Sequence, residues 1–160
     1  MRKAISNTTP IITLLSISRI ELLRDIYSKI IIPKGVYDEI EQGKDKAYYT
    51  DLSKLNWIEI KDISDREPLK YLHELDKGEA EVIVLANEIN ADLVIIDERL
   101  GREYAEYFNL NITGSMGVLL KAKELGLIKE IKPLIKQMVN NGIWLSPKLI
   151  EKITSIAKER

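Results

Sequence analysis

The stretch DKGEAEVIVLANEINADLVIIDER, residues 76–99, decides the fold class of this chain. Its first part, GEAEVIVLANEI (78–89), is apolar almost all round at its centre and is long enough for a buried helix. The apolar run LVII (93–96) follows and ends at Asp97, which is typical of a strand that is buried on both faces. A buried helix followed by a buried strand predicts a parallel sheet that is covered by helices.

The same alternation of strand and helix patterns runs along the rest of the chain. Further strands are predicted at residues 3–6, 29–32, 57–61 and 110–113. Further helices are predicted at residues 9–17, 19–27, 33–43, 66–75, 98–108, 118–126, 131–140 and 147–158, with a tyrosine-containing helical stretch between 43 and 57. This order predicts an α/β fold, a three-layer sandwich in which helices flank a central, mostly parallel sheet of about four to five strands.

The length predicts one domain over residues 1–160. We expect its core at about residues 3–130. The C-terminal helices at about 131–158 are expected either to pack on that core or to mediate oligomerisation.

The composition is that of an ordinary globular protein and restricts the available chemistry. Of the 160 residues, 45% are hydrophobic and 31% are charged, which fits neither a disordered nor a fibrous chain. Cysteine is absent, which excludes disulfides, thiolate zinc sites and a cysteine nucleophile, and is compatible with a reducing, cytoplasmic compartment. Since His73 is the single histidine, any catalysis must rest on carboxylates, hydroxyls, amides, Lys, Arg or a cation held by oxygen.

No membrane association is expected, because no stretch approaches the roughly 18 consecutive apolar residues of a transmembrane helix. The first residues, MRKAISNTTPIITLLSI (1–17), begin with two charges as a signal peptide does. However, the polar run from Asn7 to Pro10 interrupts the apolar part, so we interpret this segment as mature protein.

The net charge of −1 hides an uneven distribution along the chain. Residues 1–98 carry 13 basic and 19 acidic side chains, whereas residues 99–160 carry 11 basic and 6 acidic ones. This division is compatible with an acidic site beside a basic docking surface. Ordinary solvated helix faces produce the same division, and on charge alone they are the simpler interpretation.

Polar residues that directly follow predicted strands are the first candidates for a site. In open α/β sheets the working crevice lies beyond the carboxyl ends of the strands. Asn7 follows the first predicted strand, and Asp97 follows the strand at 93–96. Asp97 is also a good N-cap for the next helix, so both interpretations stay open at this point.

Two glutamates on predicted helices are further candidates. Glu79 shares a stripe with Val82 and Ile83, which would place a carboxylate on a buried face, whereas Glu81 is expected to face solvent. The alternative for Glu79 is a first-turn acid that the helix dipole favours. Glu39 borders the apolar face of its own helix. If these acids meet Asn7 and Asp97, the oxygen-only cluster would suit Mg²⁺ or Mn²⁺, which activates water and neutralises charge on a phosphate.

Four segments together resemble the PIN-domain family. They are AISNTTPI (4–11), PKGVYDEI (33–40), the stretch 76–99 and TGSMGVLLKAKELGLI (113–128). Their order and spacing are most similar to a prokaryotic branch of predicted nucleic-acid-binding PIN proteins, and the resemblance spans about residues 3–130.

The resemblance implies a Mg²⁺- or Mn²⁺-dependent endoribonuclease that cleaves single-stranded RNA. The acids of the family fall on Asn7, Glu39, Glu79 and Asp97, of which Glu39, Glu79 and Asp97 would hold the metal. Many relatives are toxins of VapBC-type toxin–antitoxin pairs, so the resemblance also implies a homodimer and an antitoxin protein as partner.

Asn7 departs from the family pattern, which has an acid at this position. An amide oxygen can ligate a cation but brings no charge and cannot act as a base. The alternative function is therefore a catalytically weakened or inactive module that binds RNA or an antitoxin. A receiver-like or nucleotide-binding domain is a third, weaker hypothesis, because there is no acidic pair after the first strand and no glycine-rich phosphate loop.

Several other side chains are candidates for contact with RNA or for packing. Arg99 and Arg102, just beyond Asp97, are predicted to bind the RNA backbone, with ordinary surface charge as the alternative. Ser115 opens a helix at a glycine-flanked turn and is predicted to bind phosphate, with helix capping as the alternative. Trp57 and Trp144 are predicted to be core or interface anchors.

Overall fold

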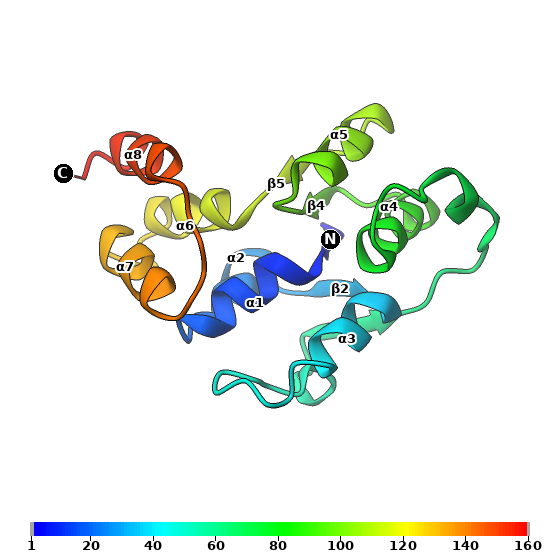
Figure 1. Ribbon diagram of the computed structural model, residues 1–160, viewed down its shortest axis with the longest axis horizontal. Helices are drawn as coiled ribbons and strands as arrows, with labels where there is room; N and C mark the ends of the chain where they lie inside the picture. The colour runs from blue at the N-terminus through cyan, green and yellow to red at the C-terminus, as the bar shows by residue number, and fades with distance from the viewer. Residues whose placement is uncertain (1, 160) are drawn as a thin grey trace.

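The computed structural model describes residues 2–159. Its strands are β1 (Ala4–Ser6), β2 (Ile30–Pro33), β3 (Ile58–Lys61), β4 (Leu93–Ile95) and β5 (Ile112–Thr113). Its α-helices are α1 (Thr8–Ser16), α2 (Glu21–Tyr27), α3 (Lys34–Glu41), α4 (Lys77–Ile89), α5 (Arg99–Tyr107), α6 (Ser115–Glu124), α7 (Lys132–Asn140) and α8 (Pro147–Ile156). Over these residues the five strands form one parallel sheet in the order β3-β2-β1-β4-β5, flanked by helices (Figure 1). The predicted α/β sandwich is confirmed.

The order of the strands reverses between β1 and β4. From β1 the chain moves outward to β2 and β3, and it then returns to the other side of β1 to form β4 and β5. The N–H of Asn7 donates to the carbonyl of Ile95 at 2.9 Å, which holds the ends of the two strands together. Ligands of open α/β sheets bind in the crevice at such a reversal, so Asn7 and Asp97 lie at the expected place for a site.

Helix α4 has the strongest burial of the described helices because its first two turns are covered on all sides. Every residue from Gly78 to Ala86 is buried. The helix begins at a capping box formed by Asp76 and Glu79, and it ends at Asn90, whose left-handed φ of 51° stops the helix. The prediction of a buried helix and a buried strand in the stretch 76–99 is therefore confirmed.

The C-terminal helices pack on the rest of the molecule through apolar residues. Met138 of α7 and Ile153 of α8 are buried, and Figure 1 shows α6, α7 and α8 together on the left. Glu159 accepts hydrogen bonds from the Lys123 ammonium and the Ile131 N–H, each at 2.8 Å. Burial alone would raise the pKa of Glu159, but these hydrogen bonds hold it below its ordinary value. The end of the chain is thereby fastened to α6 and to the start of α7.

Two predicted helical segments are wrong. The tyrosine-containing stretch between 43 and 57 consists of turns and one 3-10 turn at Leu52–Lys54, where the Asp51 carboxylate accepts the Ser53 N–H. The segment 66–75 contains only a short 3-10 helix, Glu67–Tyr71, with a proline near its start. In both places an aspartate accepts a nearby backbone N–H, Asp51 that of Ser53 and Asp65 that of Glu67, which competes with a full α-helix.

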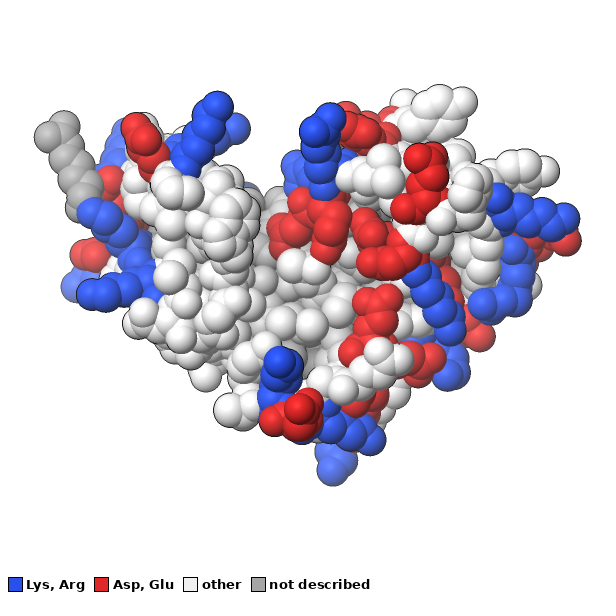
Figure 2. Space-filling view, in the orientation of Figure 1, with Lys and Arg blue, Asp and Glu red and all other residues white. Residues whose placement is uncertain are grey.

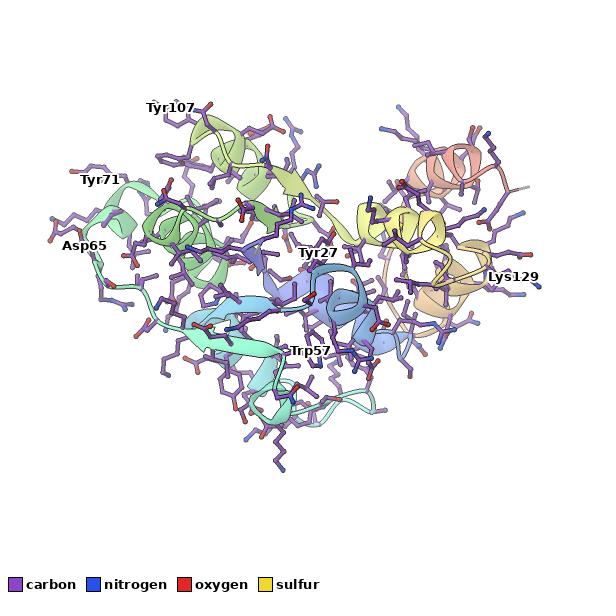
Figure 3. All side chains as sticks on the ribbon, turned by 180° about the vertical axis from the view of Figure 1, so that it is seen from behind. Tyr27, Trp57, Asp65, Tyr71, Tyr107 and Lys129 are labelled. Atoms are coloured by element: carbon purple, nitrogen blue, oxygen red, sulfur yellow. The ribbon has the colours of Figure 1, made fainter. Side chains whose placement is uncertain are left out.

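The two tryptophans occupy opposite environments. Trp57 is 9% exposed and Trp144 is 80% exposed, so the prediction of a core anchor holds for Trp57 alone. Figure 3 shows Trp57 near the centre of the molecule, whereas Tyr71 and Tyr107 point outward from its edge. Among the described residues, no helix combines the length and the apolar character that a membrane span requires.

Candidate active site

Asn7 leaves β1 at the strand reversal and is almost fully buried, with 2% of its surface exposed. Its Nδ2 donates to Oε2 of Glu98 at 3.1 Å, and the Thr9 hydroxyl donates to the other oxygen of the same carboxylate. The Oδ1 atom of Asn7 has no hydrogen-bond partner among the described residues. A buried acceptor without a partner costs roughly 1–3 kcal/mol, so this oxygen points to a ligand that the protein itself does not supply.

Glu79 presents a second unpaired oxygen. Its N–H donates to Asp76 at 2.8 Å, and its Oε1 accepts the Asp76 N–H at 3.4 Å, while Oε2 is buried without a partner among residues 2–159. Burial, the Asp76 side chain and the charge of Glu98 raise the pKa of Glu79 to about 7. The carboxylate is thus both a first-turn cap and an anomalous buried acid, the two interpretations that the sequence left open.

Glu39 reaches the same edge of the sheet from α3. Its Oε2 accepts the Thr8 hydroxyl at 2.7 Å, and its Oε1 accepts the Gly78 N–H at 2.9 Å. A Cβ at Gly78 would collide with the Glu39 carboxylate, so the glycine is what allows this close approach. Glu39 therefore connects the first turns of α1 and α4, next to Asn7.

Asp97 is held by the start of α6. The N–H of Ser115 donates to its Oδ1 at 2.7 Å, and the Ser115 hydroxyl donates to its Oδ2. Burial raises the pKa of Asp97 and the charge of Glu98 raises it further, while the Ser115 hydrogen bonds and the Arg102 charge oppose the rise. A Cβ at Gly114 would lie 2.6 Å from Oδ1. Since the N-cap of α5 is Glu98, the interpretation of Asp97 as the cap of that helix is wrong.

A family model described as a PIN domain matches residues 3–159. The chain belongs to the PIN-domain family. The match confirms the predicted resemblance and extends it beyond residue 130, through α7 and α8. Neither the comparison with curated proteins nor the comparison with solved structures found a match.

Glu98 lies in the candidate site but is not among the residues that the sequence predicted for it. It accepts hydrogen bonds from Asn7 and Thr9, and its charge raises the pKa of both Glu79 and Asp97. Its place directly after Asp97, beyond a buried strand, was the signal that could have found it. Figure 2 shows acidic side chains gathered beside a hollow between the C-terminal helices and the part that carries α4 and α5.

Glu81 contradicts the prediction of a solvent-facing carboxylate. It is 1% exposed, its Oε1 accepts the Gly35 N–H at 2.9 Å, and the Arg66 guanidinium lies 3.8 Å from Oε2. The prediction failed because the polar stripe of a helix indicates solvent only if one face is open, whereas the first turns of α4 are covered all round. Glu81 fastens α3 to α4 and shares no hydrogen bond with the residues at the strand reversal.

The predicted RNA-binding residues have different environments. Arg99 has a side chain that is 93% exposed and forms an ion pair with Glu103 at 3.1 Å. Arg102 donates to the Ile96 carbonyl at 2.9 Å and lines a cavity of ≈ 520 Å³ beside Asp97. Ser115 is 3% exposed, and its hydroxyl is used to hold Asp97, so the structure gives it a positioning contact rather than a surface for RNA.

Two atoms of the candidate site, Oδ1 of Asn7 and Oε2 of Glu79, fit a hard cation. Carboxylate and amide oxygens are the ligands that Mg²⁺ and Mn²⁺ prefer, and the unpaired Asn7 Oδ1 and Glu79 Oε2 are one of each. Within residues 2–159, no group of three or more Asp, Glu, His or Cys is already arranged to hold a metal ion. Glu39 and Asp97 are engaged instead by hydrogen bonds from Thr8, Gly78 and Ser115.

Proposed function

We propose that this PIN-domain protein is a metal-dependent endoribonuclease that cleaves phosphodiester bonds of single-stranded RNA. PIN domains have a nuclease-type fold and generally use divalent metal ions. The observation that carries the proposal is the pair of buried, unpaired oxygens on Asn7 and Glu79 at the strand reversal. A buried acceptor without a partner is costly, and a cation that binds these oxygens would remove that cost.

Glu39, Glu79 and Asp97 are the residues that would hold a Mg²⁺ or Mn²⁺ ion, with Asn7 contributing its amide oxygen. Such an ion supplies an activated water and neutralises negative charge that develops on the phosphate. The hydrogen bond from Nδ2 of Asn7 to Glu98 fixes the orientation of the amide and leaves Oδ1 free to accept. The Ser115 hydrogen bonds fix the direction of the Asp97 carboxylate, and Arg102 supplies positive charge for a phosphate beside it.

A second candidate function is a noncatalytic module that binds RNA or an antitoxin protein. The specific observation that favours it is Asn7 itself, since an amide lowers the negative charge at the site by one and weakens metal binding. The hydrogen bonds that occupy Glu39 and Asp97 point in the same direction. A toxin-like role, a homodimer, an antitoxin partner and a cytoplasmic location stay predictions from the family resemblance and the composition.

The deciding experiment is the cleavage of a labelled single-stranded RNA with Mn²⁺ and with EDTA. We expect cleavage with Mn²⁺ only, and a loss of about 100-fold or more in Asp97→Asn and Glu79→Gln, because each removes charge at the proposed site. Glu103→Gln is the matched control, since that carboxylate is exposed and pairs with Arg99 outside the site.

Absence of metal-dependent cleavage, together with an Asp97→Asn variant that behaves as wild type, would refute the nuclease proposal. If the wild type is inert and Asn7→Asp gains both Mn²⁺ affinity and cleavage, the binding module becomes the better description.

A further inference from the structure

A cavity of ≈ 520 Å³ opens beside the candidate active site, and the proposed function leaves most of it unused. Asp97 and Arg102 form one part of its lining, and the segment between α7 and α8 forms another, including Trp144. Because Asp97 belongs both to this lining and to the candidate site, whatever occupies the cavity lies against Asp97. Figure 2 shows the corresponding hollow, with an uncharged wall on the side of the C-terminal helices.

Trp144 is the most unusual side chain of this lining because 80% of its surface is exposed. Its neighbours Ile143 and Leu145 are half-buried and pack against the hydrophobic core. Single exposed apolar residues are common on protein surfaces, but an exposed indole that lines a cavity together with Asp97 and Arg102 is not explained by packing. The Trp144 side chain therefore points away from the core, whereas the residues on either side of it pack against the core.

The segment that carries Trp144 is tied down at both ends. The Asn141 side chain donates to the Ser16 carbonyl at the end of α1, and the Ile143 N–H donates to the Met138 carbonyl at 3.0 Å. At the other end, the Ser146 hydroxyl accepts the Leu149 N–H at 3.1 Å and caps α8. The indole is therefore presented by an anchored backbone, which reduces the entropy lost when a ligand binds to it.

The remaining lining combines apolar side chains, among them Ile112 and Met116, with polar groups and one positive charge. Arg102 contributes a guanidinium of which one N–H is used by the Ile96 carbonyl, and the hydroxyls of Thr9 and Ser115 already donate to Glu98 and Asp97. An apolar partner protein, or an apolar face of a second copy of this chain, would desolvate the remaining N–H groups of Arg102 without pairing them. A nucleotide matches the lining better, because it brings a flat apolar base and a phosphate together, and pockets of roughly 300–1,000 Å³ accept ligands of that size.

We propose that Trp144 stacks on a nucleobase of single-stranded RNA that occupies this cavity, next to the phosphate that Arg102 holds. Stacking platforms beside positive charge are the general means of holding single strands, and they tolerate any base because every base has a flat face. This inference rests on the proposed function for its substrate class, and it adds a binding residue that neither the family match nor the acidic site assigns.

The first experiment uses the fluorescence of Trp144 itself. In a Trp57→Phe variant, Trp144 is the only tryptophan, and it is titrated with a single-stranded RNA of ten nucleotides in Ca²⁺ instead of Mn²⁺, to limit cleavage. We expect saturable quenching of its emission. In the reciprocal Trp144→Phe variant, the buried Trp57 should show little change with the same RNA.

The second experiment measures the affinity of the same labelled RNA by fluorescence anisotropy. We expect Trp144→Ala to weaken binding about tenfold, in line with the stacking contribution of one base, and Trp144→Phe to recover most of the loss. Tyr107→Ala is the matched control, since Tyr107 is 81% exposed but lines a different cavity. An RNA with abasic sites should bind wild type and Trp144→Ala equally, because only the base stacks.

The outcomes separate this inference from the nuclease proposal. Wild-type affinity in Trp144→Ala, or an equal loss in Trp144→Ala and Tyr107→Ala, overturns it. A Trp144 emission that shifts with protein concentration and ignores RNA also overturns it, in favour of an interface between copies. If the wild type does not cleave RNA but its binding depends on Trp144, base stacking is supported and the nuclease proposal is refuted. If Trp144→Ala cleaves RNA with unchanged KM, the nuclease proposal is supported and base stacking is refuted.

Discussion

The Asn7 amide donates to Glu98 at 3.1 Å, and this single contact orients the whole amide so that its oxygen stays buried and unpaired. Where the family pattern has an acid, an amide thus lies against a carboxylate. An acid at position 7 would face Glu98 as a second negative charge, so the amide relieves repulsion that a cation would otherwise have to relieve.

Asn7→Asp should therefore depend on metal for its stability. In EDTA we expect the variant to lose about 1–3 kcal/mol of unfolding free energy, because a donor to Glu98 becomes a like charge. Adding Mn²⁺ should raise the unfolding free energy of the variant by more than it raises that of the wild type. Thermal unfolding with and without Mn²⁺ measures both effects, and Asn56→Asp, in an exposed turn, is the control. Equal melting temperatures of variant and wild type in EDTA would contradict the repulsion.

Glu79 should make the metal-free protein less stable as the pH rises. Its pKa is raised from 4.5 to about 7 by burial, by Asp76 and by Glu98, so the folded state holds a proton that the unfolded state has lost. This contribution is fully present below about pH 4.5 and is lost as the pH rises through 7. Urea unfolding in EDTA at pH 5 and pH 8 should show a smaller decrease in Glu79→Gln than in wild type. Identical decreases in the two proteins would contradict a raised pKa of Glu79. Asp97, whose pKa is also raised, lowers the stability with rising pH in both proteins alike.

Metal binding should release the same proton. Because a cation binds the ionised carboxylate, the Mn²⁺ affinity of the wild type should rise with pH up to about the Glu79 pKa of 7, on the order of tenfold per pH unit if one proton is displaced. Calorimetric titrations in two buffers with different ionisation enthalpies measure the released proton directly. A pH-independent affinity with no buffer dependence would show that Glu79 is not a ligand.

Gly101→Ala, on α5, should displace the Glu79 carboxylate of the candidate site. A Cβ at this position of α5 would lie 2.7 Å from Oε2 of Glu79, which must then move. Alanine normally favours a helix by about 1 kcal/mol over glycine, but we expect the crowding to reverse that sign and to destabilise the protein by about 1–3 kcal/mol. Gly43→Ala, whose nearest neighbour would be 3.4 Å away, is the control in thermal unfolding and RNA cleavage. A variant as stable and active as wild type would refute the close approach.

Arg102 should contribute more to RNA binding than Arg99. Arg102 lines the cavity beside Asp97, whereas Arg99 is engaged with Glu103 on the surface. We expect Arg102→Gln to lower the slope of affinity against salt concentration by about 0.7 on logarithmic axes, the value for one phosphate contact on a single strand. Arg99→Gln should change the slope less. The reverse order would move the RNA path to the outer face of α5.

Much of the site could be predicted because its residues sit at ends of regular elements. Asn7 and Asp97 follow buried strands, and parallel strands bring their carboxyl ends to one edge. Glu79 could be predicted because it shares the apolar stripe of its helix with Val82 and Ile83. Glu98 could be marked by its place directly after Asp97, but its role could not be predicted, since that role comes from a contact with Asn7, 91 residues away in the sequence.

The sequence by itself determined the fold class and the edge of the sheet at which a site would form. Both follow from local periodicity, which the run at 76–99 shows clearly, and from the geometry that all parallel sheets share. Only the tertiary structure decided that Glu81 is buried against Gly35, that Ser115 holds Asp97 and that Trp144 faces a cavity. The physical reason is that the partner of a polar or aromatic side chain is set by how distant elements pack, and a helical or strand period carries no information on that packing.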